Sequence, residues 1–164
     1  MNNNGYKSFS DIIEEDLKQL SNLMEQQPFF AFVILSIIIE VFGRCINPAS
    51  GIHVSGKSEE DFNYALEHLT SLKKYKDAPF NLYTSLRCNL AHALLAGSDI
   101  ILTTEPSNLG KKKIGVRDFF NDINAAWEEV KKDEKAIERL RKKEIIISGP
   151  SSGGTHSSLT KIIR

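Results

Sequence analysis

The sequence predicts a mainly helical fold, a bundle of four to five helices with a small C-terminal β appendage. Apolar residues recur at helical spacing over most of residues 10–143, and strand-like runs are short and lie after residue 98. A length of 164 residues fits one domain with a sizeable core. We therefore expect a disordered N-terminus over 1–9, a helical domain over 10–143 and a β hairpin or tail over 144–164.

Capping residues and hydrophobic spacing predict the first two helices. Ser10 or Asp11 can cap a helix that runs to about Gln26 and is apolar on one side. Pro28 suits the first turn of a second helix, which continues to about Ile46. Because this second helix is apolar all round, we expect it at the centre of the molecule.

The second helix is also the candidate for a membrane span. Its apolar run from Phe29 to Ile39 is shorter than a span needs, and Glu40, Arg44 and Pro48 follow it. No signal peptide is visible at the N-terminus. We therefore expect a buried core helix, no membrane partner and a cytoplasmic location.

Three further helices are expected. Ser58 can cap the third, and Ser58-x-x-Asp61 resembles a capping box. The fourth runs from about Phe80 to Ala96, where Gly97 ends it. The fifth is long and rich in charge, from Val116 to Lys143.

The β elements are expected between and after these helices. Asp99–Thr104 and Glu144–Ser148 read as strands, and Glu105–Gly115 reads as a loop. Residues 158–163 form a further candidate strand, which could pair as a hairpin or with Ile100–Thr103.

Charge is balanced over the chain but uneven along it. The formal net charge is zero, so no bulk attraction to nucleic acid or membrane follows. Basic residues gather in Lys111–Lys113 and in Arg139–Lys143. A solvated helix face explains this asymmetry better than an RNA-facing end, although both remain open. Cys45 and Cys88 lie in apolar sequence and are expected to be free thiols, with no metal or other cofactor.

The fourth helix carries the strongest functional signal. It is nearly apolar, yet it holds Arg87, Asn89 and His92, and a buried charge is costly unless it is paired or used. In one interpretation Arg87 pairs with Glu40 of the central helix. The helix also has two apolar faces, and a second copy of the chain could cover one of them.

The geometry of a regular helix separates the two strongest candidates. Ser85, Asn89 and His92 form a narrow polar stripe, since they are i,i+4 and i,i+3 neighbours. Arg87 lies about 140° from His92 around the helix axis. A long Arg side chain, a local kink or a two-fold partner would have to bring the two groups together.

The segment Leu86-Arg87-Cys88-Asn89-Leu90-Ala91-His92, after the aromatic Tyr83, resembles the Arg-x4-6-His motif of the HEPN superfamily (higher eukaryotes and prokaryotes nucleotide-binding domains). The resemblance extends beyond this segment. The apolar helix that ends Ile39-Glu40-Val41-Phe42-Gly43-Arg44 is similar to the helix that packs on the motif helix in bacterial members, and the resemblance as a whole covers roughly residues 10–97. The sequence departs from many active members at Cys88, where they have Asn, Asp or His after the Arg.

The resemblance implies a metal-independent endoribonuclease of toxin or defence type that acts as a homodimer through the motif helix. His92 would move a proton, Arg87 would stabilise charge on the phosphorane oxygens, and Asn89 would orient the phosphate or His92. The 2′-OH of RNA would attack, giving a 2′,3′-cyclic phosphate. Lys111, Lys112 and Lys113 are candidate contacts to RNA phosphates, and a cognate inhibitor protein is a candidate partner.

Two other functions remain open. One is a catalytically inactive HEPN-like dimeric module that binds nucleotide, RNA or a protein partner, which Cys88 and the neutral net charge favour. The other is a structural helical dimer in which Arg87 is a core ion pair.

Overall fold

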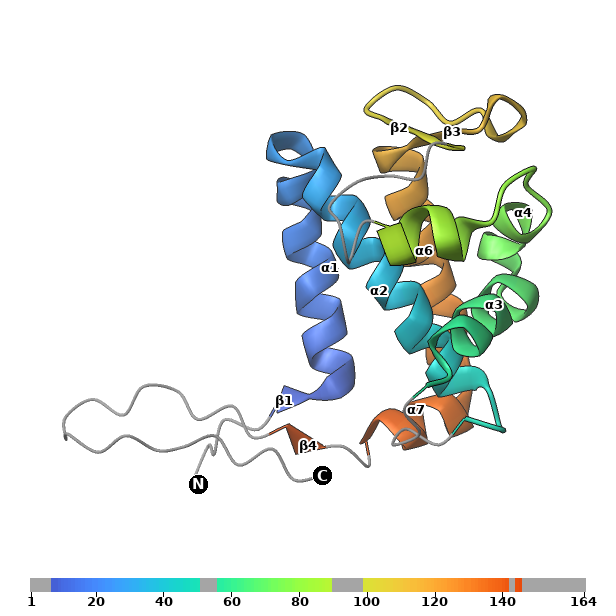
Figure 1. Ribbon diagram of the computed structural model, residues 1–164. Helices are drawn as coiled ribbons and strands as arrows, with labels where there is room; N and C mark the ends of the chain where they lie inside the picture. The colour runs from blue at the N-terminus through green and yellow to red at the C-terminus, as the bar shows by residue number, and fades with distance from the viewer. Residues whose placement is uncertain (1–6, 51–55, 90–98, 142–143, 146–164) are drawn as a thin grey trace, which may run out of the picture.

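The computed structural model describes residues 7–50, 56–89, 99–141 and 144–145. These residues form a mainly helical fold, as predicted, with two small pairs of strands, one of which lies between helices and not at the C-terminal end of the chain (Figure 1). The first two helices, α1 (Phe9–Gln26) and α2 (Pro28–Ile46), have nearly the predicted bounds, with Pro28 in the first turn of α2.

The remaining elements follow in chain order. The helical ones are α3 (Ser58–His68), the 3-10 turn η1 (Thr70–Leu72), α4 (Lys73–Lys76), the π-helix η2 (Tyr83–Cys88), the 3-10 turn η3 (Leu109–Lys111), α6 (Val116–Lys132) and α7 (Glu134–Arg141). The strands are β1 (Lys7–Ser8), β2 (Ile101–Thr103), β3 (Lys113–Gly115) and β4 (Glu144–Ile145).

Helix α2 lies at the centre of the bundle, as its composition predicted. It packs against α1, α3, α6, α7 and η2, and Phe32, Leu35, Ile39 and Phe42 are fully buried (Figure 1). Among the described residues α2 is the one helix long and apolar enough to cross a membrane, and 56% of its most apolar stretch is buried inside the protein. Burial by neighbouring helices accounts for the apolar residues on its inner faces.

The crossing of α2 and α3 depends on Gly43. A Cβ atom placed on Gly43 would lie 1.6 Å from the carbonyl oxygen of Asp61. No side chain fits in that space, so glycine allows the two backbones to touch. This close approach places Asp61 of α3 beside the C-terminal half of α2.

The long fifth helix expected over Val116–Lys143 is interrupted. It divides into α6 and α7 at Asp133, whose backbone is extended (φ −85°, ψ 99°). The Asp133 carboxylate accepts hydrogen bonds from the backbone N–H groups of Lys135 and Ala136, at 3.0 and 3.1 Å. Asp133 thus caps the start of α7 and does not continue α6. Hydrophobic spacing alone does not reveal this role.

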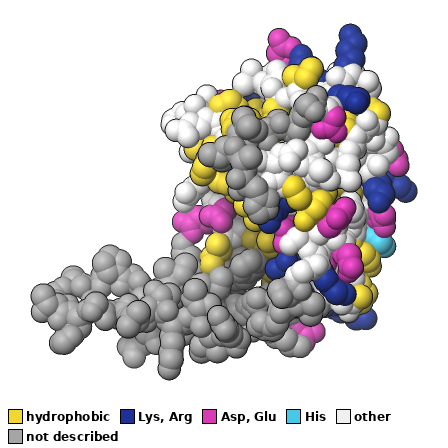
Figure 2. Space-filling view, in the orientation of Figure 1, with side chains coloured by type: hydrophobic (Ala, Val, Ile, Leu, Met, Phe, Trp, Pro, Cys, Tyr) yellow, Lys and Arg dark blue, Asp and Glu magenta, His cyan; other side chains and the backbone are white. Residues whose placement is uncertain are grey.

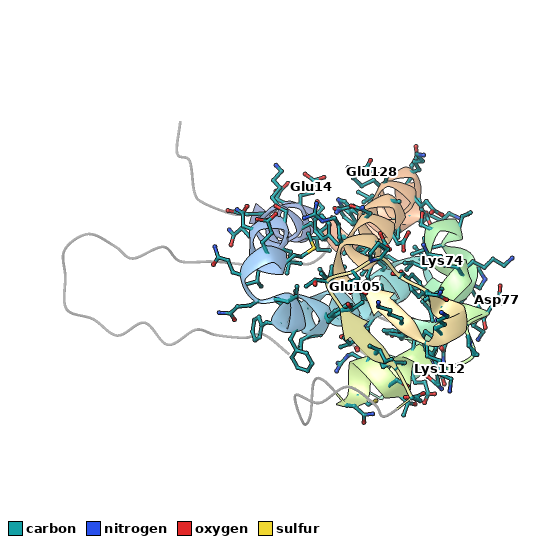
Figure 3. All side chains as sticks on the ribbon, turned by 90° about the horizontal axis from the view of Figure 1, so that it is seen from above. Glu14, Lys74, Asp77, Glu105, Lys112 and Glu128 are labelled. Atoms are coloured by element: carbon teal, nitrogen blue, oxygen red, sulfur yellow. The ribbon has the colours of Figure 1, made fainter. Side chains whose placement is uncertain are left out.

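The strands pair differently from the prediction. Within the expected Asp99–Thr104 strand, β2 pairs in parallel with β3, which lies in the segment expected to be a loop. Glu105 and Lys112 mark this unit at one end of the bundle (Figure 3). At the other end β4 pairs with β1, so part of the N-terminal segment expected to be disordered is a strand. The candidate strand 158–163 lies outside the described residues.

Large apolar side chains remain on the surface near the start of α2. Phe29 and Phe30 are 40% and 49% exposed, Ile37 is 39% exposed, and Ile101 of β2 is 58% exposed. Figure 2 shows hydrophobic side chains on the part of the surface formed by α1 and α2.

Candidate functional site

The described part of the motif helix is not a regular α-helix. Tyr83–Cys88 form a π-helix, a rare form that is found often at functional sites. The side chain of Asn81 accepts a hydrogen bond from the N–H of Thr84 at 3.0 Å, and so fixes its first turn. The angular positions calculated for an α-helix therefore do not apply from Tyr83 to Cys88.

Two side chains anchor this π-helix to other elements. Ser85 is buried, and its Oγ lies 2.7 Å from both carboxylate oxygens of Asp99. Arg87 donates from Nε to Oε2 of Glu40 at 2.9 Å, and its Nη2 lies 2.9 Å from the same oxygen. These anchors explain why the segment keeps an uncommon geometry, because tertiary contacts hold it at two points.

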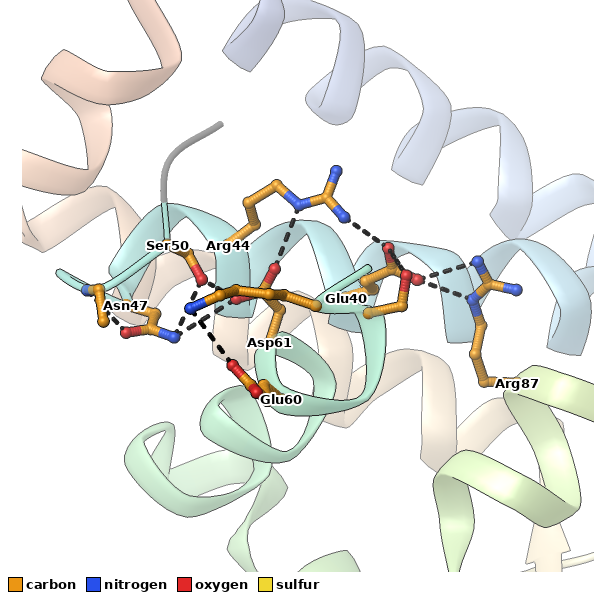
Figure 4. Close-up of polar contacts among 10 residues, drawn as sticks. Glu40, Arg44, Asn47, Ser50, Glu60, Asp61 and Arg87 are labelled. Atoms are coloured by element: carbon orange, nitrogen blue, oxygen red, sulfur yellow. Dashed lines mark hydrogen bonds and ion pairs between the residues drawn. The ribbon is translucent and has the colours of Figure 1, made fainter. Parts of the chain in front are cut away.

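Glu40 is shared between two arginines. Its Oε1 accepts a hydrogen bond from Nη2 of Arg44 at 2.8 Å and another from Oγ of Ser58 at 2.9 Å, while Oε2 takes Arg87. Figure 4 shows the two guanidinium groups approaching the carboxylate from opposite sides. The Glu40 side chain is 9% exposed, against 29% for Arg44 and 20% for Arg87.

Arg44 extends this network to Asp61 of α3. Nε of Arg44 donates to Oδ2 of Asp61 at 3.2 Å, and the other oxygen, Oδ1, accepts from Ser50 and Asn47 (Figure 4). Two arginines thus face two buried carboxylates whose oxygens all have donors. This pairing offsets the free energy lost when these charges are removed from water.

The predicted capping box at Ser58 and Asp61 is wrong. Helix α3 begins at Ser58, but Lys57 is its N-cap residue and no side chain caps it. Ser58 donates to Glu40, and Asp61 is bound by Arg44, Asn47 and Ser50. Ser58 and Asp61 therefore use their side chains in the buried network, and these side chains are not available to cap the helix.

The buried side of the π-helix also involves Tyr83 and Cys88. Burial and a side-chain hydrogen bond with Cys88 raise the pKa of the Tyr83 hydroxyl to about 12. The ring of Tyr83 packs edge-on against Phe62 of α3, with the ring centroids 5.4 Å apart. Cys88 is thereby linked to α3 through the side chain of Tyr83, five residues earlier in the chain.

The structure brings together only part of the predicted site. Asn89 follows the π-helix, and its backbone N–H donates to the carbonyl groups of Thr84 and Leu86. His92 lies outside the described residues. The pairing of Arg87 with Glu40, which was one interpretation of the sequence, is present. Arg44 and Asp61 were not predicted as site residues, although the i,i+4 spacing of Glu40 and Arg44 in an apolar helix was a usable signal.

The predicted basic contacts are only partly available to a ligand. Lys111 and Lys112 are exposed on the β2–β3 unit, where Figure 3 labels Lys112, and Lys113 forms an ion pair with Glu105. In the second basic cluster, Arg139 donates to the carbonyl oxygen of Cys45 at 2.7 Å. Arg139 therefore caps the end of α2. Within the described ranges no group of three His, Cys, Asp or Glu side chains is placed to bind a metal ion.

Comparisons of the chain with protein-family models, with curated proteins and with solved structures found no match.

Proposed function

We propose that this chain is a HEPN-like metal-independent endoribonuclease of toxin or defence type, with Arg87 and His92 as its catalytic residues. The observation that supports this proposal is how Glu40 holds Arg87. One edge of the guanidinium, Nε and Nη2, is fixed on Oε2, while 20% of the side chain remains exposed. A donor fixed in this way needs little reorganisation when charge develops on a phosphate nearby.

The negative charge of Glu40 is not used by Arg87 alone. Arg44 and Ser58 also donate to this carboxylate, so its charge is shared. Arg87 therefore keeps part of its attraction for an anion, and its planar group suits two phosphorane oxygens. Arg87 is proposed as the group that stabilises the transition state.

In the proposed reaction the 2′-oxygen of RNA attacks the adjacent phosphorus and the bond from phosphorus to the 5′-oxygen breaks. The 2′-OH loses a proton and the leaving 5′-oxygen gains one. His92 performs one of these two transfers, for which an imidazole of ordinary pKa is suited. Asn89 orients the phosphate or His92. The products are a 2′,3′-cyclic phosphate and a 5′-OH.

The proposal includes the surroundings of the site. A homodimer through the motif helix would combine two pairs of Arg87 and His92, and exposed Lys111 and Lys112 would add salt-dependent contacts to RNA. A cognate inhibitor protein is a further proposed partner. A cytoplasmic location is proposed because the surrounding helices bury more than half of the apolar stretch of α2.

A second candidate function is a catalytically inactive dimeric module that binds nucleotide, RNA or a protein partner. The buried network favours it, because Glu40 gives Arg87 a structural role that needs no substrate. Cys88, which is tied to Tyr83, occupies the position after the arginine where many active relatives of the motif have Asn, Asp or His.

The experiment compares cleavage of a random-sequence RNA and of structured RNA in EDTA. The variants are His92→Ala and Arg87→Lys, and the matched controls are His68→Ala and Arg117→Lys, both at exposed positions. Circular dichroism checks that each variant is folded. Loss of cleavage in the first two variants but not in the controls supports the nuclease.

The other outcomes separate the two candidates. If the wild type does not cleave but binds RNA in a salt-dependent way that Arg87→Lys weakens, the inactive module is supported. If the wild type neither cleaves nor binds RNA and Arg87→Lys changes only the free energy of unfolding, Arg87 is a structural residue, and both the nuclease and the RNA-binding module are ruled out.

A further inference from the structure

A groove runs between α1 and α6. The two helices are antiparallel, because Glu14 of α1 pairs with Lys131 near the end of α6 and Glu25 pairs with Arg117 near its start, at 3.5 Å in each case. Figure 3 labels Glu14 on α1 and Glu128 on α6, which both line the groove. Its volume of about 380 Å³ lies within the range of small-molecule binding sites.

The inner surface of the groove is apolar. Leu17 and Trp127 line it with buried side chains, and Phe120 lines it with a partly buried ring. The charged residues of the lining are two of each sign, so the groove has no net charge and suits an uncharged ligand with a flat apolar body. They are Glu14, Lys18, Glu128 and Lys131.

The indole N–H of Trp127 is a donor without an acceptor. The residue is 3% exposed, and its ring stacks on Phe42 of α2 with the centroids 5.6 Å apart. Among the described residues no atom accepts a hydrogen bond from its Nε1. A buried tryptophan usually pairs this N–H, and leaving it unpaired costs roughly 1–3 kcal/mol. A molecule in the groove that Trp127 lines could supply the missing acceptor.

Asn124 offers the complementary group on the same helix. It lies three residues before Trp127, so the two side chains are neighbours on one face of α6, and both line the groove. Nδ2 of Asn124 donates to the carbonyl oxygen of Phe120 at 3.2 Å. The amide oxygen Oδ1 is then the atom with which Asn124 can accept a hydrogen bond from a ligand.

We propose that the groove between α1 and α6 binds a small uncharged heterocycle with a lactam edge, as in the uracil ring. Such an edge carries a carbonyl oxygen beside an N–H. The carbonyl accepts from Nε1 of Trp127, and the N–H donates to Oδ1 of Asn124. The flat ring packs on Leu17 and Phe120, and a polar substituent such as a sugar lies toward the charged side chains.

This binding site is separate from the proposed catalytic site. Arg87 is held by Glu40, whereas Trp127 stacks on Phe42. Positions two residues apart in an α-helix are rotated by about 200° around its axis. Glu40 and Phe42 therefore contact their partners on nearly opposite sides of α2, and ligand binding can be tested without any nuclease activity.

The test uses the fluorescence of Trp127, the only tryptophan in the chain. Uridine is titrated into the full-length protein. The matched ligand is 3-methyluridine, in which a methyl group replaces the hydrogen of the lactam N–H and both carbonyl groups remain. We expect a saturable change in emission with uridine and an affinity at least about tenfold weaker for 3-methyluridine. No saturable change with uridine, or equal affinities for the two ligands, would overturn the proposal.

Variants of α6 test the two protein groups. Asn124→Leu is expected to weaken uridine binding about tenfold, whereas Asn121→Leu, the same change at an exposed position outside the groove, leaves it unchanged. Trp127→Phe keeps an aromatic ring but removes the N–H, so calorimetry should show a similar loss. Circular dichroism checks that each variant is folded. If Asn124→Leu and Trp127→Phe both bind uridine as tightly as the wild type, the proposal is wrong.

Discussion

Arg87 and Glu40 meet through one carboxylate oxygen: Nε and Nη2 of the arginine both lie 2.9 Å from Oε2. The contact joins the π-helix to the central helix, and it leaves the other oxygen of Glu40 to Arg44 and Ser58. Arg87, which we propose as catalytic, therefore also links two helices. Its catalytic and structural roles need separate tests.

The first prediction concerns the shared carboxylate. Glu40→Gln keeps the shape of the side chain but leaves two arginines without the charge between them. We expect the free energy of unfolding to fall by about 2–3 kcal/mol, less than for a fully buried pair because both arginines are partly exposed. Denaturant unfolding measures this. The matched change Glu59→Gln, on the exposed first turn of α3, should stay within about 0.5 kcal/mol of the wild type.

The second prediction concerns the contact between α2 and α3. Gly43→Ala places a Cβ atom where the carbonyl oxygen of Asp61 lies, so the helices must separate. We expect a loss of more than about 3 kcal/mol in the free energy of unfolding. Gly110→Ala is the control, since the nearest atom to its Cβ would be 3.6 Å away. Equal stability of the two variants would show that the close approach is absent.

The third prediction concerns Glu129 of α6. Its carboxylate accepts hydrogen bonds from the N–H groups of Thr70 and Ser71, at 2.7 and 2.9 Å, and from Oγ of Ser71. Partial burial raises the pKa of Glu129, but these hydrogen bonds outweigh it and hold the pKa below its ordinary value. A lowered pKa in the folded state stabilises the fold above the ordinary pKa of Glu, and the effect is lost as the pH falls below that value.

Glu129→Gln removes this dependence. We expect the variant to be about 1 kcal/mol less stable than the wild type at pH 7, as for a lost hydrogen bond, and the difference to shrink as the pH falls below about 4.5. Denaturant unfolding at each pH measures it. A difference that does not change with pH would mean that the ionised carboxylate is not the group that caps η1.

The fourth prediction concerns the break between α6 and α7. Asp133→Ala removes the side-chain acceptor for the N–H groups of Lys135 and Ala136 and should cost about 1 kcal/mol of stability. Asp133→Asn keeps an oxygen acceptor and should retain most of it. If Asp133→Ala is as stable as the wild type, packing alone sets the boundary.

Sequence patterns were sufficient for the elements that local rules determine. Hydrophobic spacing and Pro28 predicted the bounds of α1 and α2 and the central place of α2. They did not predict the π-helix, the parallel pairing of β2 with β3, or the roles of Ser58 and Asp61, because these depend on partners distant in the chain. The break at Asp133 was not predicted either. The helical spacing of apolar residues continues across it, so the sequence does not distinguish a capping Asp from a polar residue on the exposed face of one long helix.

The candidate site divides in the same way. Residue types alone suggested the pair of Arg87 and Glu40, because an arginine in an apolar helix needs a carboxylate and the central helix offers one. The participation of Ser58 and Asp61 follows from the crossing at Gly43, which no local pattern reveals, whereas the i,i+4 spacing of Glu40 and Arg44 was a local signal. The catalytic assignment of Arg87, Asn89 and His92 still depends on the resemblance of the motif.

The most direct measurement is the chemistry of the cut. RNA is incubated with the full-length protein in EDTA, and the new ends are identified by mass spectrometry, beside a substrate that has a single 2′-deoxy nucleotide at the cleavage site. The proposal predicts a 2′,3′-cyclic phosphate and a 5′-OH, no cut at the 2′-deoxy position, and no product with His92→Ala. Products with a 5′-phosphate, or cleavage that survives both the 2′-deoxy substitution and His92→Ala, would contradict it.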